Sequence, residues 1–447
     1  MFHITSYSSE NFPDVVLGRK ELNTEVNSYT SVIIGENGSG KTRLLNEIIS
    51  ANRRMISNEP LTKSNPFEIE YLGADKKLKL KKIVAISTSY NDKLPFSDND
   101  KFFDKHYQYC GIRETSNASW TSSLMRKTLD NLLHCIEKNQ STKVKDIFNF
   151  LGLSNDFRIT FSLIKKRNLD LEKCTSDELV QYVKAYYTDS SRMLVEKMAK
   201  FDQNMANSII HNFLPVIEKD KKERFIEVKI SNKTENVTDI FSNLDILRRV
   251  GIIDNVRLTL SRKDKSLNYA YIDASSGEAQ LLFSMTAFLR YVTDNCLVII
   301  DEPEISLHPN WQIKYFSLLN LLLEKLNGCH VIIATHSHFL VSELNPKTST
   351  LISLRKVEGI VKAENILSST LGWSPESVLY RVFNVRTFNS LYLDSDLKKA
   401  HKMIYAKESD IEELNKLQNK FKSLVLDELD PLNKFIESIE EFINENK

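Results

Sequence analysis

Hydrophobic residues along this chain recur in two patterns that predict buried strands alternating with helices. Short runs that are apolar without alternation occur at Ser31–Ile34, Ile83–Ile86, Leu297–Ile300 and Val331–Ala334. Runs of this kind are typical of parallel strands that are buried on both faces. The stretch Leu281–Val292 instead repeats its apolar side chains with the spacing of an amphipathic helix. Together the two patterns predict an α/β fold.

The middle of the chain has a different character, because polar loops there give way to helical periodicity. The helical stretches are Leu124–Ile136, Val144–Leu151, Ser176–Tyr187 and Ser191–Ile217. None of them carries sustained heptads, so we expect no long coiled-coil arm. The sequence therefore predicts four segments: the first half of the sheet domain at 1–90, an inserted helical domain at 91–222, the second half of the sheet domain at 223–345, and a strand pair with helices at 346–447.

Two strand-like runs precede the predicted insertion. Phe67–Leu72 and Leu78–Ser87 are separated by a short polar stretch that contains Gly73, which predicts a β-hairpin. The second run carries Lys79 and Lys81 among its apolar residues. On an edge strand such lysines either contact nucleic-acid phosphates or, more commonly, deter aggregation, and both interpretations stay open.

A glycine-rich loop joins the run Ser31–Ile34 to a helical stretch. Its sequence, Gly35 to Thr42, satisfies the spacing G-x-x-x-x-G-K-[ST]. Glycines let the backbone turn its N–H groups toward phosphate oxygens, the lysine meets the outer phosphates, and the threonine hydroxyl binds Mg²⁺. We therefore predict ATP and Mg²⁺ as ligands. The residues expected to hold the nucleotide here are Asn37, Gly38, Ser39, Gly40, Lys41, Thr42 and Arg43.

Polar residues also follow two of the apolar strands. Leu297–Ile300 continues into Asp301 and Glu302, and Val331–Ala334 is followed closely by His336. Carboxylates at the carboxyl end of a buried strand lie where ligands bind in open α/β sheets. Beside a phosphate loop, Asp301 would hold Mg²⁺ with Thr42, and Glu302 would polarise the attacking water. In isolation, Asp301 and Glu302 could also be a helix N-cap followed by an acid in the first turn.

The order of these motifs resembles the ABC/SMC-type ATPase head, an α/β head with a mixed sheet. It is most similar to compact bacterial AAA ATPases of the OLD-like and Septu type, over residues 30–90 and 250–340. The motifs that carry the resemblance are the phosphate loop, Ser275-Ser276-Gly277-Glu278, Asp301-Glu302-Pro303-Glu304, Ser306-Leu307-His308-Pro309 and Ala334-Thr335-His336-Ser337.

The resemblance implies roles for single residues. Ser276 and Gly277, with Glu278 beside them, would form a signature that contacts the γ-phosphate held by the opposite subunit. His336 would be the switch residue at that phosphate, and with Lys41 and Glu302 it completes the predicted catalytic set. Residues 306–309 would cross the dimer interface. ABC heads usually place a glutamine after the strand that corresponds to Ile83–Ile86; here Ser87 or Ser89 would take its place.

The resemblance also implies partners. It predicts a homodimer, or a higher even-numbered oligomer, that acts in bacterial antiphage defence and gates a separate effector nuclease, with an HNH-type nuclease favoured. Residues 374–385 resemble the tail of Septu-like and retron-associated ATPases. The sequence lacks the clustered acidic triad that a nuclease centre would need, so we expect no nuclease centre in this chain. The alternative is an SMC-like ATPase that clamps DNA directly.

Composition narrows the remaining possibilities. The 60 Lys and Arg against 59 Asp and Glu give a net charge of +1, so nucleic acid could contact only a local patch. The 5 cysteines include no C-x-x-C pair, which argues against disulfides and a zinc site. With no long apolar run, we expect a cytoplasmic protein without membrane contact. We expect His308, His330 and His338 to pack or cap rather than bind metal.

Overall fold

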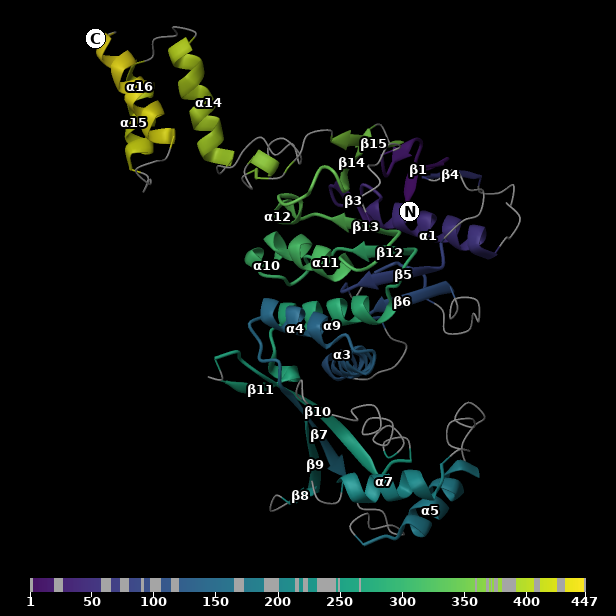
Figure 1. Cartoon of the computed structure of the whole chain (residues 1–447). Helices are drawn as coiled ribbons and strands as arrows, with labels where there is room; N and C mark the ends of the chain where they lie inside the picture. The colour runs from purple at the N-terminus through teal and green to yellow at the C-terminus, as the bar shows by residue number, and fades with distance from the viewer. Residues whose placement is uncertain are drawn as a thin grey trace. The chain divides into compact units, whose positions relative to one another are not determined.

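The computed structural model divides the chain into two compact units, Met1–Val378 and Leu379–Lys447 (Figure 1). The residues that the structure describes are 3–19, 27–57, 66–72, 80–89, 92–96, 106–113, 120–164, 173–188, 201–213, 217–219, 224–230, 247, 250–264, 267–357, 360–366, 370, 372–373, 377–379, 391–405, 411–423 and 431–445.

A seven-stranded sheet forms the centre of the first unit. Its strand order is β15-β14-β3-β13-β12-β5-β6, and every neighbouring pair is parallel except β14 with β15. This confirms the predicted α/β fold with a mixed sheet that carries a phosphate loop. The strands are β3 (Ser28–Gly35), β5 (Lys82–Ser87), β6 (Tyr107–Gly111), β12 (Cys296–Asp301), β13 (Cys329–Thr335), β14 (Ser349–Val357) and β15 (Ile360–Ile366).

Helix α1 (Lys41–Ser57) and a small antiparallel sheet cover one face of the central sheet. The small sheet has the order β2-β1-β4, with β1 (Ile4–Ser9), β2 (Val15–Val16) and β4 (Phe67–Tyr71). One apolar core joins it to α1 and to the central strands, through residues such as Ile4, Ile48 and Ile299. The phosphate-loop helix is therefore held between two sheets.

The predicted hairpin between residues 67–72 and 78–87 is wrong. β4 pairs with β1, whereas β5 lies between β12 and β6 in the central sheet. Ile83–Ile86 are all buried, which suits a strand inside the central sheet with layers packed on both of its faces. β4 is partly exposed along its length, which suits the edge of the small sheet. Because β5 is internal, it offers no basic edge to nucleic acid, and Lys79 lies outside the described residues.

The helix α9 (Ser276–Tyr291) lies on the other face of the central sheet. Its residues from Gly277 to Leu289 are all buried, including the polar Gln280, Ser284 and Thr286. The prediction that this helix has one exposed polar face is therefore wrong. The helices α3 and α4 cover the side of α9 that would otherwise meet water. Other helices of this unit are α3 (Trp120–Glu137), α4 (Ser141–Phe150), α10 (Pro309–Ile313), α11 (Tyr315–Leu323) and α12 (His338–Val341).

The segment predicted as a helical insertion contains helices and also strands. β6 belongs to the central sheet, and β7 and β8 belong to an antiparallel sheet of order β11-β10-β7-β9-β8. That sheet takes strands from both sides of residue 222, so the expected boundaries at 91 and 222 do not enclose a structural unit. Its elements are β7 (Phe157–Leu163), α5 (Ser176–Thr188), α7 (Gln203–Phe213), β8 (Ile217–Lys219), β9 (Arg224–Ile230), β10 (Ile253–Ser261), β11 (Asn268–Ala270) and the 3₁₀ turn η3 (Tyr271–Asp273).

The C-terminal part of the chain also divides differently from the expected boundary at 345. β14 and β15 belong to the central sheet, and the second unit contains the helices α14 (Leu391–Tyr405), α15 (Ile411–Lys422) and α16 (Pro431–Glu445). These helices pack around a core that includes Leu414, Phe421 and Ile439, which confirms the predicted helical C-terminal region. No helix among the described residues combines the length and apolarity needed to cross a membrane. All five cysteines have free thiols.

Candidate functional site

The phosphate loop connects β3 to α1 at the carboxyl edge of the central sheet. Gly38 and Gly40 have φ angles of +81° and +97°, which side chains with a Cβ rarely adopt. The Lys41 ammonium donates hydrogen bonds to the carbonyl oxygens of Gly35 at 2.9 Å and Glu36 at 3.2 Å. Burial lowers the pKa of Lys41, while nearby carboxylates oppose that shift. The lysine is thus held over the loop by which the sequence predicts phosphate binding.

The first residue of the acidic pair meets the loop directly. Thr42 Oγ1 donates to Asp301, at 3.0 Å from Oδ2 and 3.3 Å from Oδ1. Burial raises the pKa of Asp301 to about 7, and the charges of Glu302, Asp92 and Glu304 add to the rise, whereas the bond from Thr42 lowers it. A carboxylate that is this buried among other carboxylates is a site where a cation would be stabilised.

Glu302, His336 and Lys41 form a chain of contacts. His336 Nε2 lies 3.0 Å from Glu302 Oε1, and His336 Nδ1 lies 3.2 Å from Lys41 Nζ. An ammonium group can only donate, so Nδ1 accepts and the ring carries its proton on Nε2, where it is donated to Glu302. This hydrogen bond is the main reason that the pKa of Glu302 is lowered, so the carboxylate is ionised and available to orient water.

The loop after β12 has a constrained backbone. Glu302 and Ser306 have φ angles of +50° and +63°, which are uncommon for residues other than glycine. Glu304, which the predicted site did not include, accepts a hydrogen bond from the backbone N–H of His336 at 2.5 Å. It fixes the backbone from which the His336 ring extends. Its place in the Asp301–Glu304 motif was the only signal for it in the sequence.

The predicted signature lies at the start of α9, beside this loop. Ser275 caps the helix by accepting from Glu278 N–H at 3.2 Å, and Ser276 is exposed. Gly277 packs against the loop, since a Cβ on it would lie 2.3 Å from the Ser306 carbonyl oxygen. In the described part of the chain, no hydrogen bond joins Ser276 or Gly277 to the phosphate loop.

Glu278 is placed differently from its predicted contact with nucleotide. Its side chain is only 2% exposed, and it accepts hydrogen bonds from Arg262 at 2.8 Å and Tyr269 at 2.6 Å. Arg262 and Tyr269 come from the β10–β11 hairpin, so the Glu278 carboxylate holds that hairpin to the start of α9. A ligand would have to displace both donors to reach this carboxylate.

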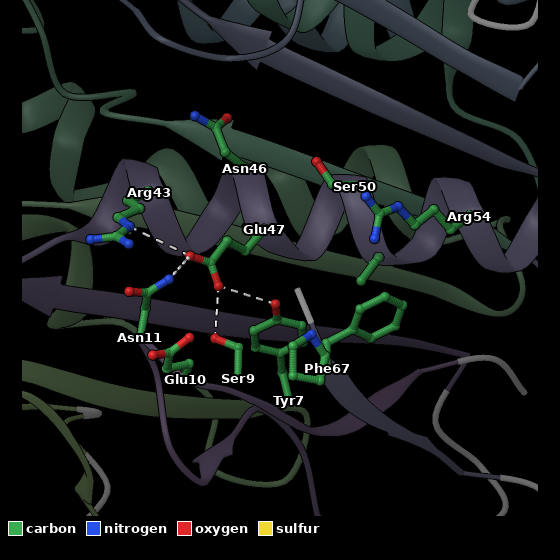
Figure 2. A pocket seen from close by; sticks show the side chains of 12 residues that line it. Tyr7, Ser9, Glu10, Asn11, Arg43, Asn46, Glu47, Ser50, Arg54 and Phe67 are labelled. Carbon is green, nitrogen blue, oxygen red and sulfur yellow. Dashed lines mark hydrogen bonds and ion pairs between the residues drawn. The ribbon is translucent and has the colours of Figure 1, made fainter. Parts of the chain in front are cut away.

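A pocket of about 440 Å³ lies along the outer side of α1. Figure 2 shows Tyr7, Ser9 and Asn11 directed at the carboxylate of Glu47, to which they donate at 3.2, 2.7 and 3.0 Å. Arg43 also reaches Glu47, at 3.5 Å, with a side chain that is 62% exposed. Arg43, a predicted nucleotide contact, is thus paired in this structure with Glu47, one turn along its own helix.

The site's donor set fits Mg²⁺ and a nucleotide. Thr42 and Asp301 present oxygen atoms, which Mg²⁺ prefers. The buried hydroxyls Ser39 Oγ and Thr88 Oγ1 have no hydrogen-bond partner, as expected of groups that pair with a ligand. The sequence predicted that Ser87 or Ser89, just after β5, would replace the glutamine of ABC heads. In the structure the buried hydroxyl without a partner there is that of Thr88, whereas Ser87 Oγ accepts from Ser89 N–H at 3.2 Å.

Asp92 is a further residue that the motif analysis missed. It is buried, it raises the pKa of Asp301 by its charge, and it accepts a hydrogen bond from Tyr109 at 2.5 Å. The polar stretch after β5 was its only signal. His308 caps α10 and His330 is fully buried, so both take the packing or capping roles predicted for them. Among the described residues, no group of three or more His, Cys, Asp or Glu side chains could hold a metal ion.

Comparisons with known proteins find a similar family over part of the chain. A family model described as an AAA domain, with a description that also refers to an AbiEii toxin and a Type IV TA system, matches residues 149–342. That range includes Ser276, Asp301, Glu302 and His336, but not the phosphate loop. Over this range, which is less than half of the chain, the sequence is similar to that AAA domain family.

Protein ea59 of Escherichia phage lambda is 26% identical over 400 residues, which cover 88% of this chain. The chain spans only 61% of the length of that relative. The Smc head domain from Pyrococcus furiosus matches 87% of this chain and 100% of its own, with a TM-score of 0.33 and 12% identity. UvrA2 from Deinococcus radiodurans matches 80% of this chain and 37% of its own, with a TM-score of 0.30 and 12% identity.

Proposed function

We propose that this protein hydrolyses ATP with Mg²⁺ at the carboxyl edge of the seven-stranded sheet. The observation that carries the proposal is the meeting of five predicted residues: Thr42 contacts Asp301, and His336 contacts both Lys41 and Glu302. These residues come from three separate parts of the chain. A structural role alone would not require a lysine, a histidine and two carboxylates to converge beside a glycine-rich loop.

Each residue has a distinct role in the proposal. The loop N–H groups and Lys41 bind the phosphates, and Thr42 and Asp301 hold Mg²⁺, which when bound neutralises charge on the phosphate oxygens. Glu302 orients the attacking water and accepts its proton. His336 holds Glu302 in place by donating from Nε2, and its Nδ1 accepts from the Lys41 ammonium that binds the outer phosphates.

The site is completed by a second copy of the chain. Ser276 is exposed at the start of α9, and its role in the signature is to contact the outer phosphate on the opposite subunit. The support is that Ser276 and Gly277 contribute nothing to the phosphate loop of their own chain in the described residues. The protein therefore acts as a homodimer or a higher even-numbered oligomer.

The cellular role follows from the motif order. We place this ATPase in a bacterial antiphage defence system, where it gates a separate effector nuclease of HNH type. The support is the resemblance to OLD-like and Septu-type ATPases. The neighbouring open reading frame tests this part: an HNH-type nuclease gene supports it, and a repair nuclease gene would favour the SMC-like alternative.

The ATPase itself is tested by one substitution. Glu302→Gln keeps the size of the side chain but removes the base, so the variant should bind ATP like wild type, lose at least about a hundredfold in turnover, and accumulate as an ATP-bound dimer. Glu324→Gln, at the end of α11, is the matched control and should change nothing. Normal hydrolysis by Glu302→Gln would refute the assignment.

The shared site is tested separately. Ser276→Arg places a large cation on the exposed start of α9, so it should abolish hydrolysis while each subunit still binds ATP. Hydrolysis at the wild-type rate by a strict monomer would refute a shared site and leave the roles of Lys41, Asp301 and Glu302 intact.

A further inference from the structure

The strand β15 is one edge of the seven-stranded sheet (Figure 1). It is 7 residues long, and among the described residues it pairs only with β14. Its burial alternates, so that Ile360, Lys362 and Glu364 are exposed and the residues between them are partly buried. The free side of such a strand carries backbone N–H and C=O groups that can pair with another strand.

The charges on the exposed face of β15 are not matched across the hairpin. Lys362 lies directly opposite Arg355 on β14, and Glu364 lies opposite Ser353. Like charges that face each other on neighbouring strands destabilise the pair. An acidic side chain on the free side of β15 would offset the charge of Lys362.

The strand itself can supply that acid, because its charge pattern is self-complementary. Ala363 is the midpoint of β15, and a two-fold axis through it pairs the whole strand with a second copy in antiparallel register. In that register Lys362 lies opposite Glu364 of the partner subunit, and Ile360 lies opposite Ile366 of the partner subunit. Each pairing occurs twice, and Ile360, which is 58% exposed, becomes covered.

This register also suits the backbone. Successive residues of a strand turn their N–H and C=O groups to opposite sides, so two paired residues must have the same orientation. Residues 362 and 364, like 360 and 366, are separated by an even number of positions and meet this condition. A ladder of hydrogen bonds can therefore form along all 7 residues of the strand.

The neighbouring two-fold registers lack the charge match. An axis through residue 362 places Lys362 opposite its own copy, and an axis through residue 364 does the same with Glu364. Either axis also leaves two residues at one end of β15 without a partner. The charges and the length of β15 therefore favour the axis through Ala363.

The strand β4 shows that this match is not general among the edges of this chain. β4 is an edge of the small sheet and has the same alternation, with Glu68 and Glu70 exposed. A two-fold axis through its midpoint, Ile69, would place these glutamates opposite each other. β4 therefore repels a second copy, as edge strands commonly do.

We infer that β15 joins two copies of this chain edge to edge, by antiparallel pairing centred on Ala363. The contact includes none of the residues proposed to bind or hydrolyse ATP, so it goes beyond the proposed function and should form without nucleotide. Together with the shared ATP site, it would link dimers into larger even-numbered assemblies.

A charge exchange tests the pairing in the full chain without nucleotide. Lys362→Glu and Glu364→Lys each place like charges together twice, so each should weaken association at least about tenfold. The double variant restores opposite charges with the signs exchanged, and it should associate like wild type. Lys184→Glu, on the exposed surface of α5, is the control and should change nothing.

Urea unfolding separates lost pairing from a damaged fold. Lys362→Glu replaces the repulsion from Arg355 by attraction, so the hairpin of the variant should be at least as stable as that of wild type. Weaker association in a chain of equal or higher stability is the result that a purely structural role of Lys362 would not give.

A cysteine at the midpoint tests the register. Ala363→Cys places two thiols at the axis, with Cα atoms about 4.5–5.5 Å apart, a separation that suits a disulfide. With glutathione disulfide as oxidant, it should form a covalent dimer at least about tenfold faster than Lys362→Cys, whose two cysteines lie out of register. Both variants carry Cys174→Ser, because the other four native cysteines are buried.

The outcomes separate this inference from the proposed function. An interface of this size is small, so sedimentation of wild type is followed up to about 200 μM. A chain that stays monomeric over that range without nucleotide overturns the inference and leaves the ATP site untouched. Association that the single variants do not weaken, or that the double variant does not recover, assigns the contact to another surface. Loss of ATP-dependent dimerisation alone would refute the shared site and not the β15 contact.

Discussion

The contact between Gly277 and Ser306 yields a sharp prediction, because it joins two backbones. A Cβ on Gly277 would lie 2.3 Å from the Ser306 carbonyl oxygen and 3.1 Å from its carbonyl carbon. An ordinary contact begins near 3.4 Å. Gly277→Ala therefore requires a movement of about 1 Å, and no side chain can rotate away to provide it.

The expected cost falls on activity more than on stability. Overpacking costs about 1–3 kcal/mol, but alanine also stabilises a helix by about 1 kcal/mol relative to glycine. The net loss of unfolding free energy is therefore about 0–2 kcal/mol. The loop that moves begins at Glu302, and a misplacement of about 1 Å near reacting groups can cost about a hundredfold in turnover.

The assay compares ATP turnover with urea unfolding. All three tryptophans, Trp120, Trp311 and Trp373, lie in the first unit, so their fluorescence follows the unfolding of that unit alone. Glu324→Gln, the control of the ATPase test, should leave both turnover and stability unchanged. Turnover by Gly277→Ala within about twofold of wild type would refute the steric reasoning.

A second substitution separates this effect from lost contact with phosphate. Ser306 has a φ angle of +63°, which glycine adopts freely, so Ser306→Gly lets the loop backbone yield. The double variant Gly277→Ala/Ser306→Gly should recover part of the lost turnover. If Gly277 acts only by touching the opposite phosphate, no recovery is expected.

Two further predictions concern groups outside the site. Burial lowers the pKa of His330 well below 6.5, so protons bind better to the unfolded chain. Stability is full above pH ~6.5 and falls as the pH drops below it, by up to ~1.4 kcal/mol per unit. His330→Gln should remove that part of the slope in urea titrations from pH 7 to 5. Glu47→Gln should cost about 1–2 kcal/mol in unfolding free energy, because the donors of Tyr7, Ser9 and Asn11 lose a charged acceptor.

Each of these two predictions has a result that would contradict it. An unchanged slope in His330→Gln would show that other groups dominate the acid dependence. Equal stability of Glu47→Gln and wild type would mean that water satisfies the donors around Glu47, a side chain that is 22% exposed. Lys184→Glu, on the exposed surface of α5, serves as the control in both titrations.

The parts of the site that the sequence predicts are those governed by local rules. A glycine loop between a buried strand and a helix, and polar residues after buried parallel strands, converge at one sheet edge whatever lies between them. Thr42 and Asp301 therefore meet although 259 positions separate them. The central strands were found for the same reason, since runs such as Leu297–Ile300 are apolar without alternation.

The parts that could not be predicted depend on long-range pairing. Phe67–Leu72 and Leu78–Ser87 look like a hairpin because they are close in sequence, yet their pairing is decided by which strand must be buried on both faces. Phe157–Leu163 alternates apolar and polar residues, a strand signal that the helical prediction for this region overlooked, but the sequence does not show that its partners are β9 and β10, far along the chain. The bonds from Arg262 and Tyr269 to Glu278 likewise arise only when the β10–β11 hairpin folds against α9.

The loop after β12 also connects the two halves of the proposed site. It begins at Glu302, which faces its own phosphate loop, and four residues later its backbone touches Gly277, which belongs to the half offered to the second copy. Both ends of this span have left-handed φ angles, and Glu304 within it is bonded to the His336 backbone, so the span has little freedom to absorb a displacement. A shift of α9 on engagement of the opposite nucleotide would therefore reach Glu302 through four residues of backbone. If the proposed shared site holds, each base would in this way be sensitive to whether the other site is filled, and hydrolysis would be a property of the closed pair.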